Sequence, residues 1–429
     1  MTSTRTGLLL ALTAALLTAC GSMPLTLNGD LPGQRAPRYD YLVTVSLQPG
    51  DTQASVQATL GGTVVAWDTS GCASGSSWSC QAMIGVNTAG QLSAQGLSTT
   101  LGRPATVEPN KDQFSGGGVL TATMGGARAI WAGGSYAPIP QNNGLWTALH
   151  LQQAQVLAPN LGAGVTVAVI DTGLDLNHSA FAGALSDPST WKDYVGGDAV
   201  PQDEGTLGIG GFGHGTNAAG IILQIAPRAK IMPIRVLGSD GSGDLVNVAS
   251  AITWAGAHGA NVINLSLGSA SDSKTVQDAI KAVTARNILV TSSADNANAD
   301  KITYPAATAE KIDGVMSVGS VTPQNIKSAF SNYSKELRIV APGEKVYAPA
   351  PGNMMAARSG TSQASPMAAG ALALALGQSL KVSVSSLPDS LTNSAFNIYA
   401  NPLNSPYAKD QKLGSGRLDL SAFLAQSVK

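Results

Sequence analysis

Residues 359–366, SGTSQASP, place three serine hydroxyl groups within eight residues. A serine hydroxyl becomes a nucleophile only when a base removes its proton and nearby donors stabilise the charge that develops on the substrate. Pro366 fits only the first turn of a helix, so we expect an Ala-rich helix to begin just before it. Ser362 then lies near the helix start, where backbone N–H groups stabilise an oxyanion. These features favour Ser362 as the nucleophile but leave Ser359 open.

A carboxylate and an imidazole stand where strands and helices are expected to meet. Asp171 ends VTVAVID, a continuous β-branched run typical of a strand that is buried on both faces. His214 lies in the glycine-flanked turn GFGHG before an apolar helix, and those glycines would let another backbone, such as a substrate strand, approach closely. Capping and turn chemistry is the alternative explanation. Together, an acid, a base and an alcohol fit catalysis by an activated serine.

Strands and helices alternate from residue 144 to the end of the chain. The predicted strands lie at 165–171, 229–237, 261–267, 287–293 and 315–321. The predicted helices lie at 216–224, 244–258, 274–286 and from about residue 361. This alternation predicts an α/β fold, with a doubly wound, mostly parallel sheet and helices on both faces. Catalytic groups in such sheets lie just past the carboxyl ends of strands or at helix N-termini.

Three stretches of this region, AVIDTGLD, GHGTNAAGII and SGTSQASPMAAG, resemble the signatures of the subtilisin-like serine proteases, or subtilases. The resemblance covers residues 144–429 and selects Ser362 over the neighbouring serines. It implies a serine endopeptidase in which Ser362 attacks the peptide carbonyl, His214 transfers the proton and Asp171 orients the imidazole. The order Asp, His, Ser and the absence of G-x-S-x-G around Ser362 argue against an esterase or lipase of the α/β-hydrolase type.

The resemblance also implies a second donor for the oxyanion hole, beside the backbone of Ser362. The family carries an asparagine after a strand, usually in A-A-G-N, and the matching stretch SSADN makes Asn296 the expected donor. Asn298 is a rival two residues on. Asp295 stands where the family has glycine, but aspartate tolerates left-handed backbone, so we expect the turn to survive. Its carboxylate would lie near the entrance to the pocket for the residue before the cut.

NLSLG matches the strand that pairs with substrate in this family. An extended peptide is therefore expected to bind the backbone groups of three residues: Ser266, Leu267 and Gly268. Two departures from the family pattern, Asn217 and Met367 in place of histidine, are not triad positions.

The first residues resemble an export signal, because a basic residue precedes an apolar run of eleven residues that is too short to span a bilayer. The stretch LTAC, which ends at Cys20, resembles the bacterial lipobox, whose cysteine is acylated and becomes the first residue. An ordinary signal peptide cut near Ala19 is the alternative. We expect a lipoprotein of the bacterial cell envelope, released if it is processed, with a signal peptide at 1–19 and a lipid-anchored tether at 20–38.

Residues 39–110 follow the order βαββαβ, the ferredoxin-like split pattern of a small α+β domain. The expected strands lie at 41–47, 62–68, 81–87 and 103–109, and the helices at 51–60 and 89–97. Cys72 and Cys80 flank a short polar loop, and in an exported chain we expect a disulfide rather than two free thiols.

The front segment is similar to the propeptide that inhibits many subtilases and assists their folding. Residues 111–143 are a Gly- and Pro-containing connector, flexible or extended, that is longer than the junction in relatives. The cut that separates propeptide from enzyme therefore falls within the connector, or the front domain stays attached. The catalytic domain is expected at 144–429.

Only 12% of the residues are charged and the net charge is −1, which gives no electrostatic case for nucleic acid as a partner. No cofactor is expected for the chemistry. Structural calcium is a further expectation, because subtilases often bind it and three acidic, glycine-rich loops offer oxygen ligands, at 196–205, 238–244 and 295–300. His178 lies near two aspartates, so a metal site is conceivable, although a structural histidine is the commoner case.

Two hypotheses follow. The first is an exported serine endopeptidase, made as a zymogen, whose partners are polypeptide substrates, its own front domain and a membrane that holds the lipid. The second is a catalytically silent or permanently inhibited subtilase-like protein that binds peptides, a reading supported by Asp295 and the long connector.

Overall fold

The structure, a computed structural model, describes residues 39–74, 80–87, 97–98, 101–110, 113–115, 119–124 and 139–429. The predicted signal peptide, the predicted lipid site Cys20 and the tether lie outside the described residues. Across the described ranges, no helix combines the length and the apolar character needed to cross a membrane.

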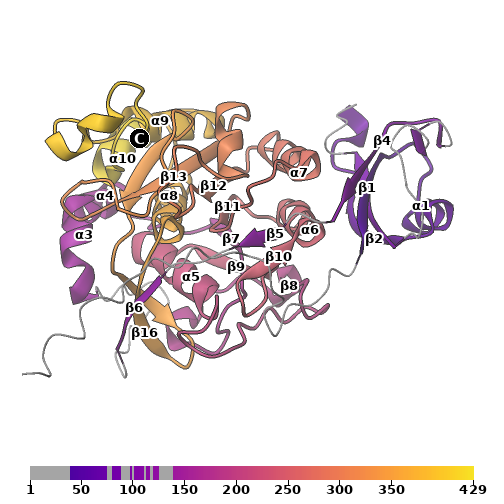
Figure 1. The fold of residues 1–429 in the computed structure, drawn as a ribbon, viewed down its shortest axis with the longest axis horizontal. Coiled ribbons are helices and arrows are strands. Elements are labelled where there is room, and N and C mark those ends of the chain that lie inside the picture. Colours follow the sequence, from indigo (N-terminus) through magenta and orange to yellow (C-terminus); the bar gives the residue numbers. More distant parts are fainter. Residues whose placement is uncertain are drawn as a thin grey trace, which may run out of the picture. The chain divides into compact units, whose positions relative to one another are not determined.

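A seven-stranded sheet forms the centre of residues 139–429, which we call the large domain (Figure 1). Neighbouring strands pair in parallel in the order β14-β13-β12-β11-β7-β9-β8. The strands are β7 (Thr166–Asp171), β8 (Lys192–Asp193), β9 (Lys230–Arg235), β11 (Val262–Leu265), β12 (Leu289–Ser293), β13 (Val315–Val321) and β14 (Ile339–Pro342). The predicted parallel sheet is confirmed.

The sheet carries helices on both faces, as predicted. The helices are α3 (Asn143–Ala148), α4 (Leu151–Leu157), α5 (His214–Ile225), α6 (Leu245–Ala257), α7 (Lys274–Thr284), α8 (Thr361–Leu376), α9 (Leu387–Asn393) and α10 (Leu420–Ser427). Val167 and Val169 of β7 share a core with α5 and α8, whereas Ala168 and Ile170 share another with α6 and α7. Successive side chains of a strand point to opposite faces, so the two helical layers lie on opposite sides.

The front domain, residues 39–110, contains a four-stranded antiparallel sheet in the order β2-β3-β1-β4. Its elements are β1 (Tyr41–Ser46), α1 (Gln53–Leu60), β2 (Thr63–Asp68), β3 (Gln81–Val86) and β4 (Ala105–Pro109). This is the strand order of the split βαβ pattern, but its second helix, expected at 89–97, lies almost entirely outside the described residues. Cys72 and Cys80 are joined by a disulfide.

Two strands lie in the connector, which the sequence suggested to be flexible or extended (Figure 1). β5 (Gln113–Ser115) pairs antiparallel with β10 (Ser242–Asp244). β6 (Val119–Met124) pairs antiparallel with β16 (Met354–Ser359), which also pairs with β15 (Val346–Ala350).

The large domain begins before the predicted boundary at residue 144. Ile139 is buried in the core of α5 and α8. The side chain of Asn142, fully buried, bonds the backbone N–H and C=O of Tyr347, at 3.0 and 2.7 Å. These two residues therefore belong to the large domain rather than to the connector.

Candidate active site

The carboxylate and the imidazole meet at the carboxyl end of the sheet. Asp171 is the last residue of β7 and His214 is the first residue of α5, and both are fully buried. Nδ1 of His214 lies 2.7 Å from Oδ1 of Asp171, which also accepts the N–H of Thr172 at 2.7 Å. A proton on Nδ1 donated to this carboxylate leaves Nε2 as the basic nitrogen.

Glycines bring the two elements together. Gly213 precedes His214 with φ +82°, a left-handed conformation that glycine adopts without strain. A Cβ on Gly215 would overlap the carbonyl oxygen of Gly173, just after Asp171. The backbone that approaches Gly215 is therefore the segment just after β7.

Ser362 is the second residue of α8, directly after β16, and is 2% exposed. Its Oγ donates to the carbonyl of Ser266 at 3.3 Å. Nε2 of His214 has no hydrogen-bond partner among the described residues, so the bond from Ser362 to His214 is not formed. Hydrogen bonds between a serine and a histidine of this kind are often long before a substrate binds. A side-chain contact between the two helix starts, Gln363 Nε2 to Asn217 Oδ1 at 3.2 Å, holds α8 against α5.

The other two serines of the motif are engaged elsewhere. Oγ of Ser359 accepts the backbone N–H of Lys345 at 2.9 Å. Ser365 is fully buried and donates to Oδ1 of Asn264 at 2.9 Å. Of the three hydroxyl groups, only that of Ser362 lies at the start of α8.

The prediction that Pro366 lies in the first turn of the helix is wrong, because α8 begins at Thr361 and Pro366 is inside it. Proline lacks the N–H that would bond the carbonyl four residues earlier, which is that of Ser362. The hydroxyl of Ser266 donates to this carbonyl at 2.9 Å instead. Because Pro366 leaves the carbonyl of Ser362 without a helical partner, Ser266 and Ser362 make two hydrogen bonds with each other.

Asn296 follows β12 and faces the start of α8. Its Oδ1 accepts the backbone N–H and the hydroxyl of Thr361, at 2.8 and 3.1 Å. These bonds fix the plane of the amide beside Ser362. Asp295 has φ +85°, so it adopts the left-handed backbone expected where the family has glycine, and its N–H donates to the hydroxyl of Thr361 at 3.1 Å.

The sequence pattern of the subtilase family matches residues 162–420. The chain belongs to the subtilase family. It is 40% identical to Subtilisin BL of Lederbergia lenta over 226 residues, which are 50% of this chain and 76% of the relative. It is 35% identical to Thermitase of Thermoactinomyces vulgaris over 227 residues, 51% of this chain and 76% of the relative. Like the other members, this subtilase is a serine endopeptidase that hydrolyses peptide bonds.

The rival donor, Asn298, is bound to a buried cation. Its Oδ1 accepts from Nζ of Lys327 at 2.7 Å, and this ammonium also donates to the carbonyl of Ser328 at 3.0 Å. The rings of Tyr333 and Tyr407 lie 5.1 and 5.5 Å from it. Burial lowers the pKa of Lys327 to about 8. The contacts of Asn298 therefore hold the loop after β12, whereas those of Asn296 reach α8.

The predicted substrate strand follows β11. Ser266 and Leu267 are buried, and the carbonyl of Ser266 faces the hydroxyl of Ser362. A side chain at Gly268 would overlap the hydroxyl of Thr303. The end of this strand therefore lies beside Ser362.

A buried charged group behind His214 was not predicted from the sequence. Asp203 accepts the hydroxyl of Thr216 at 2.9 Å, and burial, with a smaller contribution from Asp171, raises the pKa of Asp203 to about 7. Arg358, 2% exposed on β16, donates to the carbonyl of Phe212. Burial lowers the pKa of Arg358, while Asp203 and Asp171 oppose that shift. Arg358, which stands in a buried strand four residues before Ser362, was the available sequence signal.

Side chains of the suspected metal sites have protein partners. Nε2 of His178 lies 2.8 Å from the carbonyl of Met354, and its Nδ1 accepts the N–H of Ala180. Asp240 and Asp244 accept backbone N–H groups of their own loop and of α6. Across the described ranges, no cluster of three or more histidine, cysteine, aspartate or glutamate side chains is placed to hold a metal ion.

Proposed function

We propose that Asp171, His214 and Ser362 are the catalytic triad of an exported endopeptidase that is made as a zymogen. The hydrogen bond of 2.7 Å between the buried His214 and Asp171 is the observation that carries the proposal. Rotation of the Ser362 side chain away from the carbonyl of Ser266 would bring its hydroxyl to Nε2. Ser362 then attacks the scissile carbonyl, His214 takes its proton and returns it to the leaving amine, and Asp171 stabilises the imidazolium.

The oxyanion hole consists of the backbone N–H of Ser362 and the side-chain N–H of Asn296. The first N–H groups of a helix have no intrahelical partner, so that of Ser362 is available to the substrate. The bonds from Thr361 to Oδ1 of Asn296 orient the amide, so that its NH₂ group is on the side away from Thr361. Loss of one such donor costs on the order of 3 kcal/mol of barrier.

The substrate is an extended polypeptide. Backbone groups of Ser266, Leu267 and Gly268 pair with it at the edge after β11, which supplies affinity without demanding particular side chains. Asp295 is partly exposed next to Asn296, at the entrance to the pocket for the residue before the cut.

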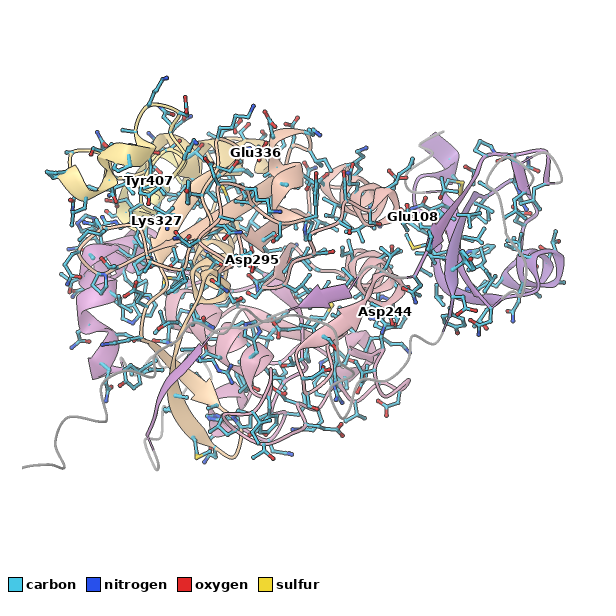
Figure 2. All side chains as sticks on the ribbon, viewed as in Figure 1. Glu108, Asp244, Asp295, Lys327, Glu336 and Tyr407 are labelled. Atoms are coloured by element: carbon cyan, nitrogen blue, oxygen red, sulfur yellow. A yellow bond between two sulfur atoms is a disulfide. The ribbon has the colours of Figure 1, made fainter. Side chains whose placement is uncertain are left out.

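The front domain, a ferredoxin-like propeptide in this proposal, is the enzyme's own inhibitor or folding assistant. Glu108, beyond the middle of β4, accepts the hydroxyl of Ser273 and the N–H of Thr275, both at 2.7 Å, at the start of α7 (Figure 2). Asn110 accepts the N–H of Val246 at the start of α6, at 3.4 Å. Helix N-termini favour anionic and oxygen partners, so these contacts support binding of this domain to the large domain.

Export and anchoring complete the proposal: a signal peptide at 1–19, a lipid on Cys20 that holds the protein at the cell envelope, and a tether at 20–38. Structural calcium, common in the family, is included without an assigned site. Cell fractionation tests the anchor, since Cys20→Ser would move the full chain from the membrane fraction to the soluble one. A membrane-bound Cys20→Ser variant would contradict it.

Reaction with a serine-directed fluorophosphonate tests the catalytic centre. We expect labelling of the wild-type protein, its loss in Ser362→Ala and its retention in the control Ser359→Ala. If the processed protein is not labelled, the alternative of a catalytically silent, peptide-binding subtilase is favoured.

A further inference from the structure

Arg358 is a buried cation that the proposed mechanism does not use. It belongs to β16, four residues before Ser362, and is 2% exposed. Burial of a guanidinium is costly unless its charge and its N–H groups find partners inside the protein. The partners of Arg358 therefore indicate what this side chain does.

The guanidinium lies against the two residues that precede His214, in a turn of residues 212–216 that we call the histidine turn. Its Nη2 donates to the carbonyl of Phe212. A Cβ on Gly213 would lie only 3.3 Å from the same nitrogen, so the guanidinium packs directly on the backbone of this turn. Because β16 continues through three residues into Ser362, one side chain joins the segment of the nucleophile to the turn of the base.

A buried carboxylate holds the same turn at two further points. Asp203 is 4% exposed and accepts the hydroxyl of Thr216 at 2.9 Å. The backbone N–H of Gly213 donates to the same carboxylate. These two donors stand before and after His214 in the chain. Arg358 and Asp203 therefore bind the histidine turn on both sides of the imidazole's own residue.

Arg358 also contributes to the charge around Asp171. Oδ2 of Asp171 is buried and has no hydrogen-bond partner in the part of the chain that the structure describes. The negative charges of Asp171 and Asp203 both attract the guanidinium. Arg358 thus brings a positive charge near a buried carboxylate even while the imidazole of His214 is neutral.

We propose that Arg358 is a positioning residue for peptide hydrolysis, which holds the histidine turn in place against the segment of Ser362, with Asp203 as its counterpart. The inference rests on the proposed triad and adds a residue that acts through the histidine rather than on the substrate. Rotation of the Ser362 hydroxyl reaches Nε2 of His214 only if the turn keeps its place. A displacement of about 1 Å can lower the rate about 10²-fold.

The kinetics of Arg358→Met in the full chain test the inference. Methionine keeps much of the volume and removes the charge and the donor. We expect kcat for a peptide substrate to fall by about 10²-fold while KM changes by less than about twofold, because the substrate contacts remain. The rate of fluorophosphonate labelling should fall by a similar factor, since it depends on the same serine and histidine.

Arg417→Met is the matched control. Arg417 is also a buried arginine of the large domain, 3% exposed, but it donates to Asn325 and lies over the ring of Phe396. Its loss should lower the temperature of unfolding and leave kcat unchanged. A fall in kcat that both variants share would overturn the inference, because it would come from lost stability.

A second variant keeps the test decisive if the loss of one buried charge prevents folding. Arg358→Met/Asp203→Asn removes both charges, and circular dichroism reports whether it folds. A folded variant with the expected loss of kcat supports positioning. A folded variant, single or double, with kcat within about threefold of the wild type overturns it. If neither variant folds, the two side chains serve stability alone and the inference is overturned.

Failure of the proposed function would give a different pattern. If the fluorophosphonate labels neither the wild-type protein nor any variant, the proposed triad is overturned and the inference with it. If it labels the wild type and Arg358→Met at the same rate, the inference alone is overturned and the triad stays in place.

Discussion

The front domain and the large domain differ in where they place buried polar groups. The front domain has a small apolar core: Val43, Val45, Val56, Ala82, Ile84 and Val86. Its buried Asp68 and Asn110 bond Ser70 and Tyr39 of their own domain and also reach the large domain, through Arg286 at 3.9 Å and the N–H of Val246. The large domain buries charge within itself, in Asp171, Asp203 and Arg358 around the histidine.

This difference separates two uses of polar side chains. Charges that surround His214 cost folding free energy because they are removed from water, and they are kept where the reaction needs a fixed carboxylate. Asp68 and Asn110 of the front domain are buried too, but they lie where the two domains meet and link the domains. Variants of the two sets should therefore change different properties: chemistry and pH dependence for the large domain, and domain stability and association for the front domain.

The largest effect is expected for Asp171→Asn. The amide favours the wrong imidazole tautomer, so kcat should fall by about 10⁴-fold, as in other serine proteases. Peptide hydrolysis by the processed enzyme measures it, with the exposed Asp187→Asn as the control. A loss below tenfold would remove Asp171 from the triad, and an unfolded variant would show that the carboxylate serves stability instead.

The next effect concerns pH. The pKa of Asp203 is about 7 in the folded protein, above its ordinary value, so the folded state holds a proton that the unfolded state has released. Stability from this group is therefore full below about pH 4 and is lost as the pH rises to 7, by up to about 4 kcal/mol. Urea unfolding of Ser362→Ala at pH 5 and pH 8 measures the loss, and adding Asp203→Asn should flatten it. If Asp203→Asn left the difference in unfolding free energy between pH 5 and pH 8 unchanged, Asp203 would not be buried and protonated in the folded protein.

Removal of the disulfide should affect the front domain alone. Cys72 and Cys80 are eight positions apart, and opening a loop of this size lowers stability by about 2.5 kcal/mol. In Cys72→Ser/Cys80→Ser, amide exchange should accelerate in β1 and β3 and stay slow in β7 and β11. Equal acceleration in both sheets would show that the two domains unfold as one unit.

The smallest effect is expected for Glu108→Gln. The substitution keeps the shape and removes the negative charge at the start of α7, which contributes about 0.5–1 kcal/mol. In the Ser362→Ala chain, Glu108→Gln should lower the urea concentration at which the front domain unfolds, by an amount that corresponds to this free energy. Glu310→Gln, an exposed change of equal charge away from this contact, is the control. An equal shift in both variants would show that the effect comes from the change in net charge and not from the contact of Glu108 with α7.

The elements that carry Asp171 and His214 could be predicted from the sequence because their signals are local. The β-branched run that ends at Asp171 and the apolar helix after His214 carry their own periodicity. The connector strands were not predicted, since β5 is only three residues long, both strands adjoin glycine-rich stretches, and they pair with β10 and β16, far along the chain.

In the candidate site, too, residue positions have local sequence signals, whereas side-chain contacts depend on distant parts of the chain. Motif positions indicated Asp171, His214, Ser362 and Asn296, but the orientation of each side chain depends on partners elsewhere in the chain. The hydroxyl of Ser362 faces Ser266 rather than the imidazole, which no local pattern encodes. The burial of Asp203 was missed for the same reason, because its loop reads as an exposed, acidic segment.

Gly215 is a position at which this enzyme tolerates little change of residue. Since even one methyl group there would collide with the carbonyl oxygen of Gly173, the spacing between acid and base is determined by direct backbone contact. A library randomised at this codon and selected for proteolysis should return glycine almost exclusively, whereas exposed positions nearby would accept many residues.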